Sequence, residues 1–230
     1  MKFSVVIATY NEAFHIASSL KRLRQISTQG ALEVIVVDGR SDDDTAAQAR
    51  PWADQVLRHE RPNCGEQLHL GAQKATGSLL LFLPGDAQLP GNWQQALERT
   101  WLDPALQGVA ATAFTAEFGS GALVRLASLL SNAEVRLLGR AGLYHGLCTT
   151  DELYRRSGGF PPLPCLAEQG FCARLRQLGR VALLPEHIHP SASRLHRYGV
   201  LGCAARRLWR ELRFKLGAPP EELWRSGLGE

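Results

Sequence analysis

Apolar residues in the first half of the chain form short continuous runs, and amphipathic segments separate these runs. The runs at 3–8, 32–37 and 79–83 are almost entirely apolar, with Ser4 and Glu33 as their polar members, which is typical of strands buried on both faces. Residues 13–24 have the spacing of an amphipathic helix, and residues 66–75 also have helical character. This alternation predicts an α/β fold with three layers, α/β/α, around a mainly parallel sheet.

The remaining elements are less regular. We predict strands at 54–58, 108–118 and 181–184, and helices at 122–138, 168–178 and 200–216. A further helix opens at Ser41–Thr45, where a serine precedes an acidic first turn. No internal repeat, low-complexity segment or linker interrupts the chain, so we expect a single domain over residues 1–230.

Composition narrows the class of protein. With 230 residues, of which 45% are hydrophobic and 21% charged, the chain can bury one sizeable core and is neither disordered nor a disulfide-stapled mini-protein. Five cysteines without a Cys-x-x-Cys pair predict free thiols in the cytoplasm. The net charge of +4 is too small to predict nucleic-acid binding. The longest apolar run is far shorter than the ~20 residues that cross a bilayer.

Polar residues follow three of the predicted strands at their carboxyl ends, where open parallel sheets bind ligands. Thr9, Tyr10, Asn11 and Glu12 follow the first strand, Asp38 follows the second, and Asp86 follows the strand at 79–83. Since these ends meet at one edge of the sheet, we expect a ligand site rich in carboxylates there.

These strand ends resemble those of a known enzyme family. Residues 5–12 together with 34–42 are similar to the opening of family 2 glycosyltransferases, which are inverting enzymes with the A-type fold and a Rossmann-like nucleotide-sugar-binding sheet. The segment 80–83 with Asp86 looks like their metal-binding Asp-x-Asp segment. Gly158-Gly-Phe-Pro161, followed by Glu168, looks like their acceptor-side segment with the catalytic base.

The tail from Leu183 to Val200 is similar to a small bacterial subfamily labelled as associated with arsenosugar biosynthesis. The resemblance implies a nucleotide-binding half over 1–100, an acceptor-side half over 101–198, and a basic amphipathic C-terminal helix over 199–230. It further implies a metal-assisted, inverting transfer of a sugar from a UDP- or GDP-sugar to a hydroxyl acceptor, with Mn²⁺ or Mg²⁺ as cofactor.

Carried over residue by residue, the resemblance implies nucleotide-sugar contacts for Thr9, Tyr10, Glu12, Asp38, Gln67, Asp86 and Arg194. It implies metal ligation by Asp86 and His189, and general-base catalysis by Glu168. The chemistry agrees at two positions. A carboxylate such as Asp38 can accept hydrogen bonds from an imide or from ribose hydroxyls. An inverting transfer needs one base, here Glu168, to deprotonate the acceptor.

Each carboxylate has a second, structural interpretation: Asp38 as a helix cap, Asp86 as a turn residue, and Glu168 as a first-turn helix residue. The chain also departs from the family. Pro84 stands where another metal ligand is usual, and Tyr144-His145 stands where the subfamily has Asp-Gln. These departures leave a second hypothesis, a degenerate protein that binds a nucleotide sugar or a partner without catalysis, and a third, a nucleotidyltransferase.

The last predicted helix, at 200–216, combines arginines with leucines, Trp209 and Phe214. Basic and aromatic residues together favour peripheral contact with an anionic membrane surface. The alternative is that the apolar residues pack on the domain and leave a solvated basic face. The sequence alone leaves both interpretations open.

Overall fold

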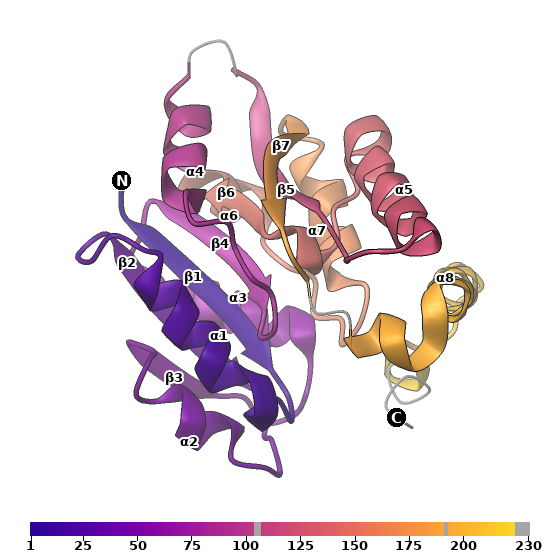
Figure 1. The fold of residues 1–230 in the computed structure, drawn as a ribbon, viewed down its shortest axis with the longest axis horizontal. Coiled ribbons are helices and arrows are strands. Elements are labelled where there is room, and N and C mark those ends of the chain that lie inside the picture. The colour runs from indigo at the N-terminus through magenta and orange to yellow at the C-terminus, as the bar shows by residue number, and fades with distance from the viewer. Residues whose placement is uncertain (104–106, 191–192, 224–230) are drawn as a thin grey trace.

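The computed structural model describes residues 1–103, 107–190 and 193–223, and it shows a seven-stranded sheet between two layers of helices (Figure 1). The strands are β1 (Phe3–Thr9), β2 (Leu32–Asp38), β3 (Gln55–Arg58), β4 (Leu79–Pro84), β5 (Val109–Ala116), β6 (Leu147–Thr150) and β7 (Arg180–Ile188). The helices are α1 (Ala13–Gln25), α2 (Thr45–Ala49), α3 (Cys64–Lys74), α4 (Trp93–Leu102), α5 (Ala122–Leu138), α6 (Asp151–Ser157), α7 (Ala167–Leu175) and α8 (Ser193–Lys215), with a 3₁₀ turn, η2 (Leu143–His145).

The strand order is β3-β2-β1-β4-β6-β5-β7. β1 lies at the centre of a parallel group, with β2 on one side and β4 on the other. β6 runs antiparallel between β4 and β5, and β5 pairs with β7 in parallel. The predicted fold class, a mainly parallel α/β sheet, is therefore confirmed, and β6 is its antiparallel member.

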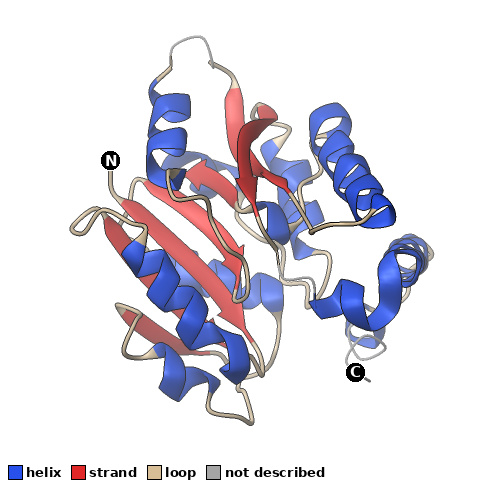
Figure 2. Ribbon diagram, viewed as in Figure 1, coloured by secondary structure: helices blue, strands red, loops and turns tan. Residues whose placement is uncertain are grey.

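Successive residues of the central strands enter two different cores. Phe3 and Val5 of β1 pack with α1 and α4 on one face, whereas Val6 packs with α3 and α7 on the other. Leu81 and Phe82 of β4 divide in the same way. The sheet is thus covered on both faces, as the apolar runs predict, and helices flank both sides of it in Figure 2.

Several elements differ from the sequence-based expectation. α3 begins two residues earlier than predicted, because the Asn63 side chain caps it by accepting a hydrogen bond from Glu66 N at 3.1 Å. β7 continues past its predicted end at Leu184, and a register shift against β5 carries the strand beyond Pro185. The predicted helix at 200–216 starts earlier, at Ser193, and Gly199 (φ 67°) kinks it.

The helices α4 and α6 and the strand β6 were not predicted. β6 has only four residues, and its position depends on pairing with β4 and β5, which are distant in the sequence. α6 follows it directly, and Thr150 caps this helix by accepting a hydrogen bond from Leu153 N at 3.1 Å. These elements carry the chain back across the sheet to the segment around Glu168.

Candidate functional site

A buried glutamine joins the carboxyl ends of β1 and β2. The side-chain amide of Gln67 donates to the carbonyl oxygens of Thr9 (2.9 Å) and Val37 (2.7 Å), and its Oε1 accepts from Asn63 N at 3.0 Å. Gly39 N adds a further bond to Thr9 O at 2.9 Å. Gln67 therefore holds the two strand ends in place, and its direct contact with a nucleotide stays a prediction.

Asp38 is the last residue of β2 and is only 2% exposed. Its carboxylate accepts hydrogen bonds from the backbone N of Ser41 at 3.0 Å and from the Ser41 hydroxyl. Asp38 thus has a structural role in this protein, as the alternative interpretation predicts. It stabilises a turn and does not cap a helix. Each carboxylate oxygen retains a lone pair, so a nucleotide contact remains chemically available and stays a prediction.

The loop between β1 and α1 is tied to the loop after β2 by polar contacts. Asn11 N donates to Ser41 Oγ and Asp42 N donates to Asn11 Oδ1, both at 2.9 Å, and Glu12 N donates to Thr45 Oγ1 at 2.7 Å. These bonds make the two loops one unit at the edge of the sheet. The Glu12 side chain is half-buried there, and so is that of Tyr10.

Thr9, the last residue of β1, has a buried hydroxyl that lacks a hydrogen-bond partner within the described part of the chain. Buried hydroxyls nearly always have a partner, so Thr9 Oγ1 is an exception, and its contact with a nucleotide sugar stays a prediction. A side chain at position 85 would contact both Thr9 and Glu12, because a Cβ at Gly85 would lie 3.5 Å from Thr9 Cγ2 and 3.9 Å from Glu12 Cγ.

Asp86 follows Gly85 in the loop after β4, and this loop lies beside the end of β7. Gln88 and His189 form an isolated bridge in which each backbone N donates to the other's carbonyl oxygen at 2.9 Å. The bridge brings the segments that carry Asp86 and His189 together. His189 is also 3.9 Å from Glu117, which follows β5 and whose carboxylate is 3.0 Å from His187 Nδ1.

The hydrogen bond with His187 lowers the pKa of Glu117, and the charge of His189 adds to this effect. The two histidines thus share one carboxylate, as their alternation along the strand predicts for side chains on one face. Across residues 1–103, 107–190 and 193–223, no three His, Cys, Asp or Glu side chains form a group that can hold a metal ion. The protein donors proposed for a metal therefore amount to the pair Asp86 and His189.

Glu168 lies in the first turn of α7, half-buried, near a hydrogen-bonded group from α5 and η2. Ser131 Oγ is 2.9 Å from Tyr144 Oη and 3.3 Å from His145 Nε2. His145 Nδ1 lies 3.1 Å from Gly142 N and 3.3 Å from Gly142 O, so a backbone hydrogen bond holds the ring in either tautomer. The residues that replace Asp-Gln therefore form a connected polar group.

Burial governs the protonation of this group. Burial raises the pKa of Tyr144, and the negative charge of Glu168 adds to that rise. Burial also lowers the pKa of His145 to about 4, with a contribution from the charge of Arg207. Both side chains are consequently neutral at pH 7. Tyr144 can donate a hydrogen bond, and it does not repel the negative charge of Glu168.

Arg207 of α8 was seen in the sequence only as part of a basic run. In the structure it pairs with Glu134 of α5 and, at 3.0 Å, with Glu211 of α8, while Gln169 of α7 donates to Glu211 at 2.9 Å. These contacts attach α8 to α5 and to the residue next to Glu168. In the sequence, the only sign of this group is that Arg207 and Glu211 are four residues apart, a spacing at which side chains of a helix pair. The side chain of Arg194 lies outside those that the structure describes.

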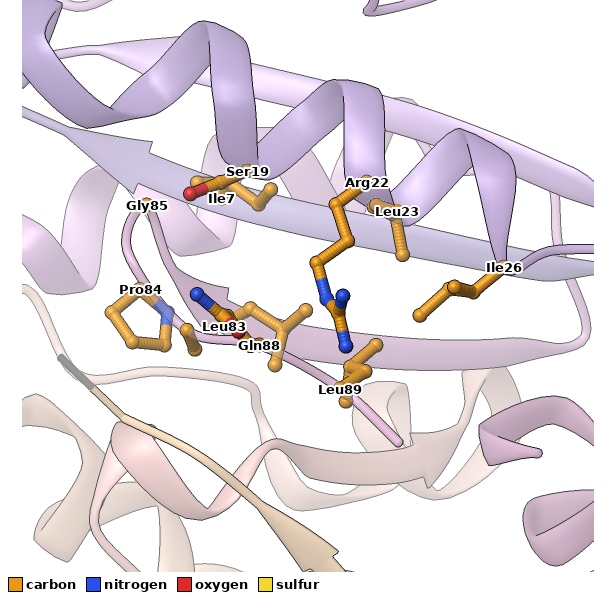
Figure 3. A pocket seen from close by; sticks show the side chains of 11 residues that line it. Ile7, Ser19, Arg22, Leu23, Ile26, Leu83, Pro84, Gly85, Gln88 and Leu89 are labelled. Carbon is orange, nitrogen blue, oxygen red and sulfur yellow. The ribbon is translucent and has the colours of Figure 1, made fainter. Parts of the chain in front are cut away.

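A shallow groove runs between α1 and the loop after β4 (Figure 3). Ser19 and Arg22 line it from α1, and Pro84, Gly85 and Gln88 line it from the loop. Asp38, Glu117 and Glu168 are not among its lining residues. The groove therefore neighbours the carboxylate-rich edge without containing it.

Several solved structures are similar in fold to this chain. A mannosyltransferase from Pyrobaculum calidifontis, in complex with GDP-mannose and Mn²⁺, has a TM-score of 0.66 at 22% identity, over 83% of this chain and 57% of its own. S. aureus TarS 1–349 in complex with UDP-GlcNAc has a TM-score of 0.63 at 19% identity, over 83% of this chain and 58% of its own. The chain thus spans less than two thirds of the length of these two proteins.

A third similar structure is glucosyl-3-phosphoglycerate synthase from Mycobacterium tuberculosis, in complex with Mn²⁺, UDP-glucose and phosphoglyceric acid. Its TM-score is 0.66 at 21% identity, over 95% of this chain and 80% of its own. The model of glycosyl transferase family 2 matches residues 4–157, and the chain belongs to this family. No match was found among curated proteins.

Proposed function

We propose that the protein transfers a sugar from a UDP- or GDP-sugar to a hydroxyl acceptor, with inversion at the anomeric carbon. The observation that carries this proposal is the carboxylate-rich edge. The register of β1 sets Thr9 opposite Asp38 and Ala8 opposite Pro84, so Asp38, the unpaired Thr9 hydroxyl and the Asp86 loop are neighbours. In this arrangement Asp38 and Glu12 contact the nucleoside, together with Tyr10, and Thr9 bonds the donor.

Asp86 and His189 are the proposed protein ligands of a divalent cation, since carboxylate oxygen and imidazole nitrogen both bind Mn²⁺. Pro84 offers no ligand, so the diphosphate of the donor supplies most of the remaining ones. A bound Mn²⁺ or Mg²⁺ offsets the negative charge of the diphosphate leaving group. The similar structures that contain Mn²⁺ with UDP-glucose or GDP-mannose support the use of a divalent cation.

Glu168 is the proposed general base. Its carboxylate takes the proton of the acceptor hydroxyl while the acceptor oxygen attacks the anomeric carbon. The bond from that carbon to the diphosphate breaks on the opposite side, and the nucleoside diphosphate leaves with the bonding electrons. The contacts of Arg207 with Glu211, and of Glu211 with Gln169, support the segment that carries Glu168. This support matters because a shift of about 1 Å can cost about 100-fold in rate.

The first test is calorimetric titration with UDP and with GDP, each with and without Mn²⁺. We expect one nucleotide to bind in a metal-dependent way, and Asp38→Ala to abolish its binding. Asp44→Ala is the matched control, because Asp44 is an exposed carboxylate in the same loop. Binding that Asp38→Ala leaves intact would remove the proposed donor site.

The second test is release of nucleoside diphosphate from the matching nucleotide-hexose in the presence of simple sugar and polyol acceptors. Glu168→Gln should keep donor binding and lose release. Unchanged release in Glu168→Gln would refute the assignment of the base.

Arg194 and Gln67 remain proposed contacts of the donor. The arsenosugar-associated subfamily also remains a proposal, and it rests on residues 183–200.

One alternative has a specific observation in its favour. Pro84 removes a metal ligand, and Tyr144 and His145 are held in internal hydrogen bonds. A nucleotide-sugar-binding protein without catalysis would show donor binding and no release with any acceptor. The two tests separate this alternative from the enzyme. We place either function in the cytoplasm, because all five cysteines are free thiols.

A further inference from the structure

Two helices at one end of the molecule carry most of its exposed apolar side chains. Apart from Met1, Phe14 and Leu102, every exposed large apolar residue in the described part of the chain lies on α5 or within 201–216. On α5 these residues are Leu123, Leu126, Leu129, Leu130, Leu137 and Leu138, and within 201–216 they are Leu201, Leu208, Trp209, Leu212, Phe214 and Leu216. Figure 1 shows α5 and α8 next to each other, away from β3 and α2.

The outward face of α5 is apolar along its whole length. The inward face of the helix packs on the domain through Ser128, Asn132 and Val135. Leu126, Leu130 and Leu137 recur on the opposite side at helical spacing, and Leu137 is 81% exposed. Surface helices of globular domains usually place polar residues there, so this apolar face indicates an interaction site.

The outward face of α8 has the same character. Leu201, Leu208, Leu212 and Leu216 recur at intervals of four and seven residues and are all exposed. A neighbouring face of the helix holds Arg207 and Glu211, whose contacts attach the helix to α5 and α7. Because these contacts fix the orientation of α8, its leucines stay exposed.

Most charged residues on these two helices are basic. Their only acidic residues are Glu134 and Glu211, and both are paired with Arg207 on the inner side. The basic residues include Arg125 and Arg136 on α5 and Arg210, Arg213 and Lys215 on α8. The Arg213 guanidinium stacks over the Trp209 ring at 5.1 Å. Arg213 also pairs with Glu222, which follows α8, at 3.5 Å. Apolar residues flanked mainly by cations complement a negatively charged lipid surface.

We propose that the outward faces of α5 and α8 together form a docking surface for an anionic membrane. The leucines enter the boundary between headgroups and acyl chains, and the long basic side chains reach the lipid phosphates. No helix in the described ranges is long and apolar enough to cross a membrane, so this contact is made by lying on the surface. A second copy of the chain is a poorer occupant, because a symmetric contact would bring these cations against each other.

The test is flotation of the full chain with vesicles, without any donor, so that it is independent of sugar transfer. We expect flotation with phosphatidylglycerol–phosphatidylcholine vesicles and little with phosphatidylcholine alone. L126S/L130S and L208S/L212S should each weaken binding about tenfold or more, because each removes two inserted apolar side chains. Phe14→Ser is the matched control, since Phe14 is 89% exposed but lies on α1.

The leucine variants could lose binding because they misfold, so variants of exposed charged residues provide a second test. R136Q/K215Q changes only exposed polar groups and should weaken binding about fivefold for each cation removed. Binding should also fall when NaCl is raised from about 0.1 M to about 0.5 M. The proposal is overturned if the chain does not float with anionic vesicles, or if the leucine variants float as well as the wild type. It is likewise overturned if light scattering shows a dimer that these variants convert to monomer.

Discussion

Arg207 of α8 and Glu134 of α5 form an ion pair although 73 residues separate them in the chain. The guanidinium also contacts Glu211, which in turn accepts from Gln169 next to Glu168. Through this group, one arginine links the C-terminal helix, with its apolar outward face, to the wall beside the candidate base.

Arg207→Ala should therefore affect catalysis more than stability. The pair is about one third exposed, so we expect a loss of about 1 kcal/mol in the free energy of unfolding. We expect sugar transfer to fall about tenfold, because the segment that carries Glu168 loses a support. Urea unfolding and the rate of nucleotide release measure the two effects. Lys215→Ala, at the exposed end of the same helix, should change neither, and an unaltered rate in Arg207→Ala would contradict the positioning role.

Gln67→Glu should destabilise the fold strongly. The substitution replaces the two amide hydrogens that bond Thr9 O and Val37 O with a carboxylate oxygen facing the same carbonyls. We expect a loss of about 2 to 4 kcal/mol in the free energy of unfolding, measured by urea denaturation. Gln73→Glu, on the exposed side of the same helix, serves as the control. Equal midpoints for the two variants would show that Gln67 does not hold the strand ends.

His145 should make stability depend on pH. Its pKa is lowered to about 4 by burial, from an ordinary value of 6.5, so the unfolded chain binds a proton in this range that the folded protein does not. Stability is complete above about pH 6.5 and is lost as the pH falls toward 4, by about 2 kcal/mol between about pH 7 and pH 5. His145→Gln should flatten this part of the pH profile of urea unfolding, and a profile that keeps its slope in the variant would assign the effect to another group.

Pro84→Asp should strengthen metal binding. Asp86 and His189 are the proposed protein ligands, and a carboxylate two residues before Asp86 adds a third. We expect the affinity for Mn²⁺ in the presence of the bound nucleotide to rise about tenfold or more, measured by calorimetry. Pro84→Ala removes the ring without adding a ligand and is the control. An affinity that rises equally in both variants would point to backbone relaxation and not to coordination.

The parts of the fold that could be predicted are those that depend on residues close together in the sequence. The strands β1, β2 and β4 lie within a residue or two of their predicted ends, because burial on both faces requires a continuous apolar run. β6 and the continuation of β7 past Leu184 were not predictable, because both depend on pairing with strands that are distant in the sequence.

The amino-acid sequence by itself determined that carboxylates follow buried parallel strands, and thereby where a ligand site belongs. Only the tertiary structure decided which polar groups are already engaged. Gln67 and Arg207 meet partners 58 and 73 residues away, and the hydroxyl of Thr9 is left without one. The physical reason is that a strand or helix periodicity records burial along the local chain. The hydrogen-bond partners of a buried polar side chain exist only after distant segments have packed together.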